Sequence, residues 1–535
     1  MQTEQFDYII VGAGSAGCVL ANRLSADGRY RVLLLEAGGK DRNIWIHVPL
    51  GYGKTMFNPK LNWMFETEPV PELNGRRVKQ PRGRVLGGSS SLNGLLYVRG
   101  QREDYDDWKS LGCDGWGYHD VLPYFIRSED QERGADPWHG TGGPLAVSDF
   151  PDDKHPIADA FIASAIAHGI PYNNDFNGDG QEGVGYFQAT ARDGLRCSTA
   201  VGFLRPAMQR GNLVVRTHAH VQRVLFADKR ATGIEYQRHD GSLHIARARC
   251  EIILSAGALQ TPQLLELSGV GHPEVLSRLG VPLVHAAPDV GENLQDHLQA
   301  RLIYETRDKI TVNDDLVSWR RKVGMVLRYI THRRGPLTWL AGIAGGFART
   351  DPSFLRPDIQ FHLYPYSSDR ADPSLHSFSA FTLTVCKLRP EARGSVHAVS
   401  RSPLMPPSIQ PNYLNHPADV ATMIAAVKLG RSVMAGAPTQ RLITDEYSPG
   451  RDCRTDDDIL AFIREKAFSV YHPVGSCRMG SDATAPVDPQ LRVRGIDGLR
   501  VADASIMPII VSGNTNAAAI MIGEKAADLI LAKSR

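Results

Sequence analysis

The N-terminal segment contains the pattern that most constrains the fold of this chain. Residues 6–11 (FDYIIV) form a continuous apolar, β-branched run, which is typical of a parallel strand buried on both faces. The turn GAGSAG follows, then a segment with apolar residues at helical spacing, and then a second buried strand over residues 30–35. This order predicts a strand–turn–helix–strand unit and therefore an α/β fold.

The turn GAGSAG has the spacing of a dinucleotide-binding turn. Gly12 allows the tight turn, Gly14 lets a pyrophosphate approach the backbone, and Gly17 permits close packing of helix on strand. The N-terminus of the following helix offers amide donors and a positive dipole end to phosphates. Glu36 lies 19 residues after Gly17, at the end of the second strand, where its carboxylate accepts from ribose hydroxyls. An acidic residue there argues against NADP but does not separate NAD from FAD, and a turn with no ligand is the alternative.

The rest of the chain alternates between strand and helix patterns, with no clear linker and no internal repeat. Residues 455–458 form a capping box that opens a helix. A strand pattern over residues 498–506 precedes a Gly/Asn turn and a closing helix that begins at Asn516, so we expect the chain to return to its first domain. We also expect strands within 213–256, helices within 257–280 and an antiparallel strand pattern over 378–400.

Residues 318–334 form one conspicuous amphipathic segment. Its apolar face holds Trp319, Val323, Val326, Leu327 and Ile330, and its basic face holds Arg320, Arg321, Lys322, Arg328, Arg333 and Arg334. A basic amphipathic helix of this kind can lie on an anionic membrane. We favour a surface helix of a second domain, because amphipathicity is the ordinary pattern of any surface helix, and keep peripheral membrane contact as the alternative.

The composition excludes several classes of function. The 60 basic and 58 acidic residues nearly cancel, which leaves no field suited to nucleic acid. Seven cysteines without a CxxC motif predict neither a disulfide framework nor a metal site.

The N-terminus does not have the pattern of a signal peptide, and no apolar stretch is long enough to span a membrane, so we expect a soluble, cytoplasmic protein. The 51 glycines of the 535 residues gather in a few places, which favours ligand sites lined by backbone.

Two further glycine-rich regions carry polar residues suited to chemistry. Residues 82–100 (RGRVLGGSSSLNGLLYVRG) place small residues around Asn93, so that backbone amides can close around something flat or anionic. Near the C-terminus, proline and glycine flank His472 in YHPVGSCRMG, and an Asn-rich turn follows 44 residues after His472. A neutral imidazole can take a hydroxyl proton near pH 7, so His472 is a candidate base. Asn514 and Asn516 can equally serve in turn formation and helix capping.

Taken together, these motifs resemble the glucose–methanol–choline (GMC) family of FAD-dependent oxidoreductases. The resemblance runs from about Phe6 to the last helix. Its most specific parts are GALQTPQLLELSGVG and the combination of His472 with Asn516. The segments that carry it are GAGSAG with Glu36, GRVLGGSSSLNG, GALQTPQLLELSGVG (257–271), PDVGENLQDH (288–297), LRPEARGSV (388–396), YHPVGSCRMG (471–480) and VADASIMP…NTNAA.

The resemblance implies two interleaved domains. One is a Rossmann-like FAD-binding domain assembled from residues 1–155, 194–305 and 470–535. The other is a substrate-binding domain of residues 156–193 and 306–469, built on an antiparallel sheet that roofs the flavin.

The resemblance also implies which residues hold FAD. The pyrophosphate would lie on the first glycine turn, the ribose on Glu36, the adenine on the Val221 backbone, and the flavin near Asn93 and the C-terminal turn. The full expected set is Gly12, Gly14, Ser15, Ala16, Gly17, Glu36, Ala37, Arg84, Val85, Gly88, Asn93, Gly94, Leu95, Leu96, Val221, Tyr471, Asp503, Ala504, Asn516 and Ala517. Some members attach the flavin through a histidine just before the motif asparagine, but Leu92 stands there, so we expect noncovalent FAD.

The activity that the resemblance implies is oxidation of a primary alcohol, aliphatic or aromatic, to the aldehyde. His472 would accept the alcohol proton while hydride leaves for the flavin N5, and Asn516 would orient the substrate oxygen. Oxygen and a quinone or artificial acceptor are both open as the electron acceptor, and further oxidation of the aldehyde is also open.

Several alternatives remain at this point. Choline oxidation would need an aromatic cage with a carboxylate, for which Tyr364, Tyr366 and Trp339 are available. A lyase or photodecarboxylase of the same family, or a redox-silent flavin binder, would use FAD without net oxidation of an alcohol. A plain NAD dehydrogenase would leave the second and third motifs without a role.

Overall fold

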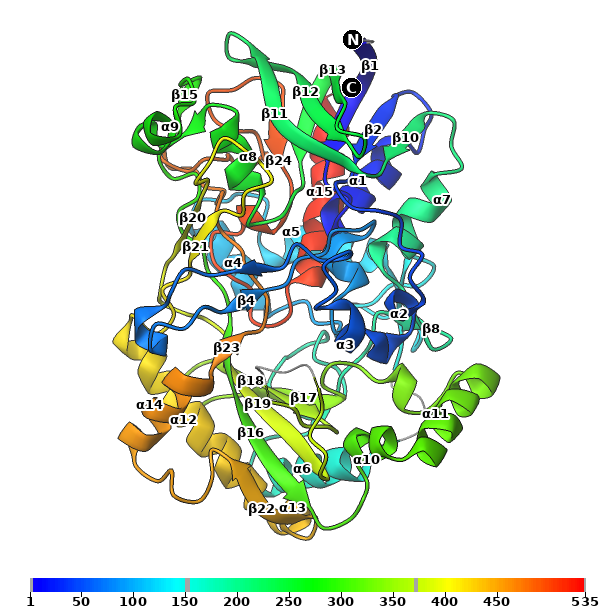
Figure 1. The fold of residues 1–535 in the computed structure, drawn as a ribbon, viewed down its shortest axis with the longest axis vertical. Coiled ribbons are helices and arrows are strands. Elements are labelled where there is room, and N and C mark those ends of the chain that lie inside the picture. The colour runs from blue at the N-terminus through cyan, green and yellow to red at the C-terminus, as the bar shows by residue number, and fades with distance from the viewer. Residues whose placement is uncertain (1–2, 150–153, 370–373, 534–535) are drawn as a thin grey trace.

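The computed structural model describes residues 3–149, 154–369 and 374–533. Two halves, each built around a sheet, lie end to end along the long axis (Figure 1). Both chain termini lie in the first half, at the top of Figure 1. The second half, at the bottom of the view, is made of the middle of the chain.

The sheet of the first half has a parallel core in which the N-terminal strand is central. β1 (Thr3–Val11) pairs in parallel with β2 (Val32–Leu35) on one side and with β13 (Leu243–Leu254) on the other. The predicted strand–turn–helix–strand unit is therefore present, and its strands are buried as the apolar runs indicated. β10 (Leu213–Arg216), β12 (Arg230–Arg238), β11 (Ala219–Ala227) and β24 (Leu499–Val501) complete the sheet.

The C-terminal helix returns to the N-terminal unit, as we expected. α15 (Asn516–Lys533) packs along α1 (Ser15–Leu24), and the two lie side by side in Figure 1. The Arg23 guanidinium pairs with the buried Glu524 carboxylate at 2.6 Å. β24 joins the same sheet by pairing with the end of β13. The first half is thus assembled from segments at opposite ends of the chain.

The second half has an antiparallel sheet with one packed face and one lining face. In β16 (Leu298–Thr306), Leu298, Ala300 and Leu302 pack into the core beneath the sheet, whereas Gln299 and Arg301 point to the other side. Helices α6 (Pro156–Ala167), α12 (Pro417–Met434) and α14 (Asp456–Lys466) contribute to that core. The other strands are β22 (Ile443–Ser448), β19 (Ala380–Lys387), β18 (Ile359–Tyr364), β17 (Ala344–Ala348), β7 (Gly183–Tyr186) and β23 (Phe468–Ser469).

The fold class is confirmed, and the elements follow the predicted ones closely. The expected helical region 257–280 is α8 (Thr261–Leu267) and α9 (Pro273–Leu279), and the capping box at Thr455 opens α14. One strand departs from the predicted division, because β16 belongs to the second sheet although most of its residues fall in the range assigned to the first domain.

The remaining elements are short connections and the helices at the edges. α4 (Arg102–Ser110) and α5 (Tyr118–Ser128) belong to the first half, and α10 (Val312–Val317) and α11 (Trp319–His332) lie at the outer edge of the second (Figure 1). The short helices are α2 (Ile44–His47), α3 (Tyr52–Thr55), α7 (Arg205–Ala207) and α13 (Ala437–Gln440). The short strands are β3 (Phe65–Glu66), β4 (Lys79–Gln80), β5 (Glu129–Gln131), β6 (Leu145–Val147), β8 (Ala191–Arg192), β9 (Leu195–Arg196), β14 (Val270–Gly271), β15 (His285–Ala286), β20 (Ser395–His397) and β21 (Ser408–Gln410).

Candidate active site

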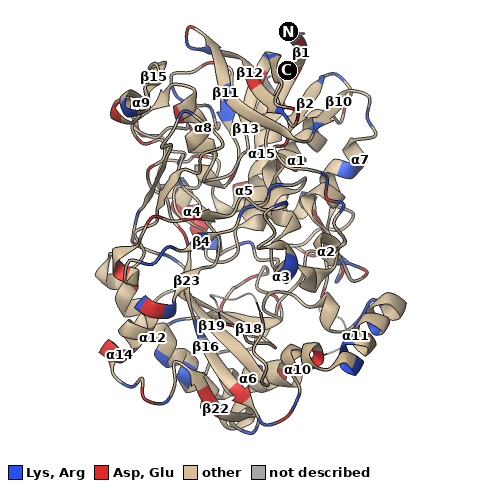
Figure 2. Ribbon diagram, in the orientation of Figure 1, with Lys and Arg blue, Asp and Glu red and all other residues tan. Residues whose placement is uncertain are grey.

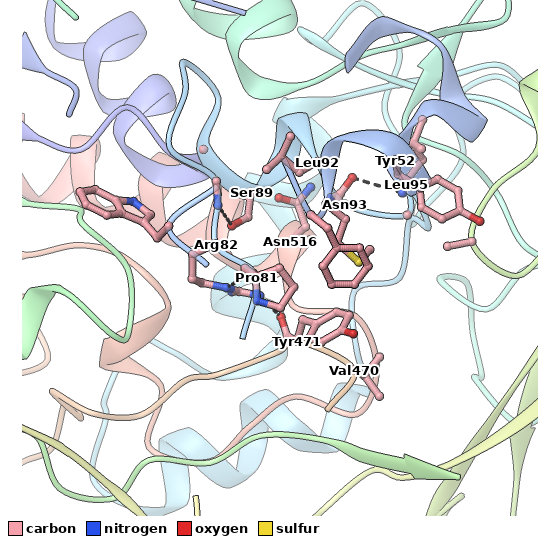
Figure 3. Close-up of a pocket in the computed structure, with 18 of the residues that line it drawn as sticks. Tyr52, Pro81, Arg82, Ser89, Leu92, Asn93, Leu95, Val470, Tyr471 and Asn516 are labelled. Atoms are coloured by element: carbon pink, nitrogen blue, oxygen red, sulfur yellow. Dashed lines mark hydrogen bonds between the residues drawn. The ribbon is translucent and has the colours of Figure 1, made fainter. Parts of the chain in front are cut away.

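A central cavity of about 960 Å³ is lined by both halves of the molecule. Glu36 and Val221, from the first sheet, line it together with His472 and Asn514, from the C-terminal segments, and Tyr364, from the second sheet. Its walls are mainly apolar, with a few polar groups, which is the character of a site for a small molecule or cofactor. Figure 3 shows part of this lining.

The first glycine turn leaves no room for a side chain at two of its glycines. A β-carbon built on Gly12 would lie 2.4 Å from the Ser255 carbonyl oxygen, and one on Gly17 would lie 1.9 Å from the Gly12 carbonyl oxygen. No side chain caps the N-terminus of α1, whose cap residue is Gly14. The first-turn amides of this helix are thus left without a side-chain acceptor, beside a cavity that Gly14, Ser15 and Ala16 line.

The Glu36 carboxylate is held at the end of β2 by backbone amides. It accepts hydrogen bonds from the amides of Ala13 (2.9 Å) and Gly38 (2.8 Å). Burial raises the pKa of Glu36 to about 7, against the lowering effect of these two hydrogen bonds. Its position on the cavity wall leaves it able to accept from a hydroxyl group of a ligand.

The second glycine cluster faces the first. A β-carbon on Gly88 would lie 2.7 Å from the Gly14 α-carbon, so two glycines let these turns approach each other. Asn93 is fixed from behind by the buried Arg196, which donates to its side-chain oxygen (2.6 Å) and to its backbone carbonyl (2.8 Å). These two hydrogen bonds fix Asn93 in the wall of the cavity.

His472 is held in a strained and heavily hydrogen-bonded loop. Tyr471 adopts a left-handed backbone conformation (φ 68°), and its carbonyl accepts from Arg82 (Figure 3). The Asp296 carboxylate accepts from the His472 backbone amide at 2.7 Å and from the Ser469 hydroxyl at 2.5 Å. These contacts fix the backbone of the histidine before any ligand binds.

A second histidine fixes which ring nitrogen of His472 carries the proton. His297 Nε2 lies 2.7 Å from the Leu388 carbonyl oxygen, which can only accept, so this nitrogen donates. Burial lowers the pKa of His297 to about 4, so its Nδ1 carries no proton at neutral pH. His297 Nδ1 lies 3.0 Å from His472 Nδ1, which must therefore be the donor. His472 Nε2 therefore carries no proton and is an acceptor.

His472 is neutral as well as oriented. Burial lowers its pKa well below the ordinary value, and the neighbouring His297, His362 and Arg82 lower it further. A neutral imidazole with its Nε2 lone pair available has the properties of a general base.

The asparagine beside His472 is Asn514, and not Asn516 as we expected. The Asn514 amide nitrogen lies 3.3 Å from His472 Nε2, and its amide oxygen accepts from Gln360 at 3.3 Å, which sets the orientation of the amide. The side-chain oxygen of Asn516 instead accepts from Ser15 at 2.7 Å, at the start of α1. The two residues separate because the turn ends at Asn516, where α15 begins.

Most of the residues expected to bind the cofactor line the central cavity. Four do not: Gly17 packs against the Gly12 turn, Arg84 lies over the Trp63 ring (4.7 Å), and Val85 and Ala517 are in the core. The expected residues that do line it are Gly12, Gly14, Ser15, Ala16, Glu36, Ala37, Gly88, Asn93, Gly94, Leu95, Leu96, Val221, Tyr471, Asp503, Ala504 and Asn516.

Some residues around the cavity were not singled out from the sequence. His297 stands in the segment PDVGENLQDH, but nothing local relates it to His472, which lies 175 residues further on. Arg301 and Gln299 line the cavity from β16, where the alternation of a half-buried strand is their only signal. Trp339, considered above for a cation cage, does not line the cavity and packs edge-on against His155.

Within the described ranges, no group of His, Cys, Asp and Glu side chains could hold a metal ion, and all seven cysteines are free. No helix among the described residues is both long and apolar enough to cross a membrane.

The comparisons with known proteins agree with one another along the whole chain. The chain is 44% identical to an alcohol dehydrogenase [acceptor] of Pseudomonas putida, over 99% of this chain and 96% of the relative. It is 41% identical to an oxygen-dependent choline dehydrogenase of Yersinia pseudotuberculosis, over 98% and 94% of the two chains. Its fold matches a crystal structure of pyridoxine 4-oxidase from Mesorbium loti with a TM-score of 0.88 and 31% identity, over 98% of each chain.

A second solved structure, a formate oxidase variant of Aspergillus oryzae studied for FAD modification, matches with a TM-score of 0.94 and 26% identity, over 100% of this chain and 99% of the other. Family models described as GMC oxidoreductase match residues 6–299 and 390–523. The chain belongs to the GMC oxidoreductase family.

Proposed function

We propose that this protein uses noncovalently bound FAD to oxidise a primary alcohol to the aldehyde. The observation that carries the proposal is the pair formed by His472 and Asn514. An unprotonated ring nitrogen lies 3.3 Å from an amide donor, both on the cavity wall and both fixed from behind. Alcohol oxidation needs one group to take the hydroxyl proton and another to hold the oxygen.

The central cavity suits FAD in shape and chemistry. Its lining includes a carboxylate for the ribose at Glu36, the uncapped start of α1 for the pyrophosphate, and the Asn93 wall for the ring system. Leu92 lines the cavity at the position before Asn93 and offers no nucleophile, which supports noncovalent binding. When bound, FAD supplies the acceptor for the hydride that leaves the alcohol carbon.

The residues of the chain control the proton and the position of the alcohol. A hydroxyl group placed beside both nitrogens donates to His472 Nε2 and accepts from the Asn514 amide. His472 takes the proton onto Nε2 as the carbon–hydrogen bond breaks, and its charge is shared with His297 through the Nδ1 hydrogen bond. His472 is buried, and a site of low polarity strengthens both contacts. Asn514 therefore takes the orienting role that the sequence led us to expect of Asn516.

The charges in the cavity favour an uncharged alcohol over choline. The carboxylates that line it within the described ranges are Glu36 and Asp503, which both accept from backbone amides, and Asp369, whose side chain is 62% exposed. Arg301 also lines the cavity, 4.8 Å from the Phe468 ring, and its guanidinium donates to the Ser368 backbone carbonyl at 3.2 Å. A quaternary ammonium group would meet a cation there instead of the carboxylate that it needs.

Anaerobic reduction of the bound flavin tests the proposal directly. Benzyl alcohol or a long-chain alkanol should bleach the flavin absorption of the purified holoprotein, and choline should do so much more slowly. His472→Ala should slow bleaching by about 10²- to 10⁴-fold while the flavin content stays the same. Normal reduction of this variant would exclude the role assigned to His472, and no bleaching of the wild-type protein by any alcohol would favour a redox-silent flavin protein.

The electron acceptor is identified by the second half-reaction. Reduced protein is mixed in a stopped-flow instrument with oxygen in one experiment and with a quinone in another, and reoxidation of the flavin is followed. Fast reoxidation by oxygen assigns the protein as an oxidase, and fast reoxidation by the quinone alone assigns it as a dehydrogenase.

A further inference from the structure

The amphipathic segment around α11 is not packed as an ordinary surface helix. Its buried side is formed by Met325 and Tyr329, which pack against Val48 and Leu337. The apolar residues noted in the sequence lie on a neighbouring stripe and remain exposed: Trp319 (70%), Val323 (48%), Val326 (39%), Leu327 (56%) and Ile330 (63%). Spacings of three and four residues place all five on one face of the helix.

Such a stripe differs from scattered exposed apolar residues. Single exposed apolar side chains are normal, whereas a contiguous patch marks a surface that contacts something. The preceding α10 extends the patch, because Val317 at its end is 67% exposed. The two helices therefore carry apolar side chains that the rest of the protein does not cover.

The charge of α11 identifies the partner. Residues 319–334 hold Arg320, Arg321, Lys322, Arg328, Arg333 and Arg334 and no acidic residue. Figure 2 shows α11 with Lys and Arg positions and no Asp or Glu, at the outer edge of the molecule. This local excess of positive charge stands out in a chain whose net charge is only +2. An apolar stripe beside basic side chains suits the interface of an anionic lipid bilayer. The apolar side chains enter the acyl region, and the Arg and Lys side chains contact the anionic headgroups.

The same helices form part of the wall of the central cavity. Leu316, Val317, Lys322, Met325 and Val326 line it, and Val317 and Val326 are also exposed to solvent. Residues that are both cavity lining and exposed mark a mouth of the cavity. A bilayer against α11 would thus lie at this mouth, where an apolar molecule dissolved in the lipid can enter without crossing water.

We propose that α10 and α11 dock this protein on the surface of an anionic lipid bilayer, with this mouth of the central cavity toward the lipid. The docking is peripheral: the helix lies in the interface plane and does not cross the membrane. The proposal concerns binding to lipid alone and stands whether or not the proposed alcohol chemistry is correct.

Sedimentation of the full-length holoprotein with vesicles tests this docking. Vesicles of phosphatidylcholine with phosphatidylglycerol should carry the protein into the pellet, and vesicles of phosphatidylcholine alone should bind it much less. Raising the salt concentration should weaken the binding, because headgroup attraction is screened. Equal binding to both vesicle types, or none to either, would overturn the proposal.

Variants on the exposed stripe separate α11 from the rest of the surface. Leu327→Glu with Ile330→Glu should lower vesicle affinity by at least about tenfold, and Arg320→Gln by about fivefold. None of these three residues lines the central cavity, so flavin content and anaerobic reduction should be unchanged. The matched control is Leu355→Glu with Leu404→Glu, at positions 101% and 58% exposed elsewhere on the surface, and this control should bind as the wild type does.

The alternative partner for this exposed apolar patch is a second copy of the chain. Sedimentation velocity of the wild-type protein should show the same mass as the Leu327→Glu, Ile330→Glu variant. A larger wild-type assembly that the variant dissociates, without vesicle binding by either protein, would assign the patch to self-association and exclude the membrane.

Discussion

At the scale of single residues, two side chains act through His472 without needing to touch the substrate. Asp296 holds the backbone of the histidine, and His297 holds its ring and sets its tautomer. Neither contact is visible in the order of residues along the chain. The local surroundings of His472 were enough to single it out, but the residues that fix its backbone and its tautomer come from another segment.

The two asparagines of the C-terminal turn should separate in function. Asn514→Ala should slow flavin reduction by about 10²-fold, because the substrate oxygen loses its donor. Asn516→Ala should mainly weaken FAD binding, because this residue faces Ser15 at the start of α1. Flavin content after gel filtration and the rate of anaerobic reduction measure the two effects. The reverse pattern would return the orienting role to Asn516.

His297 should matter to the rate and not to alcohol binding. His297→Leu removes the acceptor for His472 Nδ1–H, and we expect about a tenfold lower kcat with KM unchanged. His297→Gln keeps an acceptor and a donor on one side chain and should restore most of the rate. Equal loss in the Leu and Gln variants would mean that His297 acts only through packing.

The pH dependence of the rate should report the low pKa of His472. The base must be neutral to accept the proton, and burial with nearby His297 keeps its pKa well below the ordinary value. We expect kcat/KM to stay level as the pH falls from 8 to 6.5, with the acid limb at lower pH. A limb centred above pH 7 would contradict this assignment.

At the scale of elements, the turn before α1 was the most predictable part of the fold, because each of its glycines has a local reason. The β-carbon that Gly17 lacks would clash with the turn itself. Other choices were not local. Which asparagine faces His472 depends on the backbone at Gly513 (φ 137°) and on where α15 begins, and the sequence alone shows two equivalent residues.

Substitution of Gly17 should disrupt this element, whereas a matched substitution elsewhere should not. Gly17→Ala puts a β-carbon 1.9 Å from the Gly12 carbonyl oxygen, so the turn must move, and we expect loss of bound FAD and of folded protein. Gly324→Ala, in α11, meets open space and should be neutral or stabilise the helix by about 0.5–1 kcal/mol. Flavin content and thermal unfolding distinguish the two. Normal FAD binding by Gly17→Ala would show that the turn can accommodate a β-carbon at position 17, against this prediction.

At the scale of the whole molecule, the family resemblance led us to expect two interleaved domains, and the sheets show how the chain is shared between them. The sequence could not predict which of the two sheets β16 joins, because a buried strand has the same apolar pattern in either sheet. The exposed stripe on α11 was equally hidden: the pattern shows that a helix has an apolar face but not whether the protein covers it.

Stability of the whole fold should fall in mildly alkaline solution. His397 lies between Glu266 (2.7 Å) and Glu292 (3.0 Å); burial lowers its pKa, but these hydrogen bonds outweigh that effect and raise it to about 9. A raised pKa gives stability that is complete below about pH 6.5 and is lost as the pH rises through 9. The loss is up to about 3 kcal/mol.

Calorimetry at pH 7 and pH 9.5 measures this effect. The Tm of the wild-type protein should fall between the two values, and the fall should be smaller in His397→Gln, which has no proton to release. An identical fall in both proteins would mean that His397 does not contribute to the alkaline loss.

The return of the C-terminus to the first sheet has a consequence for how the protein is made. Synthesis proceeds from the N-terminus at about 5–20 residues per second, so α1 leaves the ribosome roughly tens of seconds before β24 and α15 exist. During that time the side of α1 that packs on α15 has no partner, and Asp503 and Asn516, which line the cavity, are not yet made. The nascent chain therefore has to stay folding-competent without its cofactor until β24 and α15 have been made. A ribosome stalled before residue 499 should display a chain that holds no flavin.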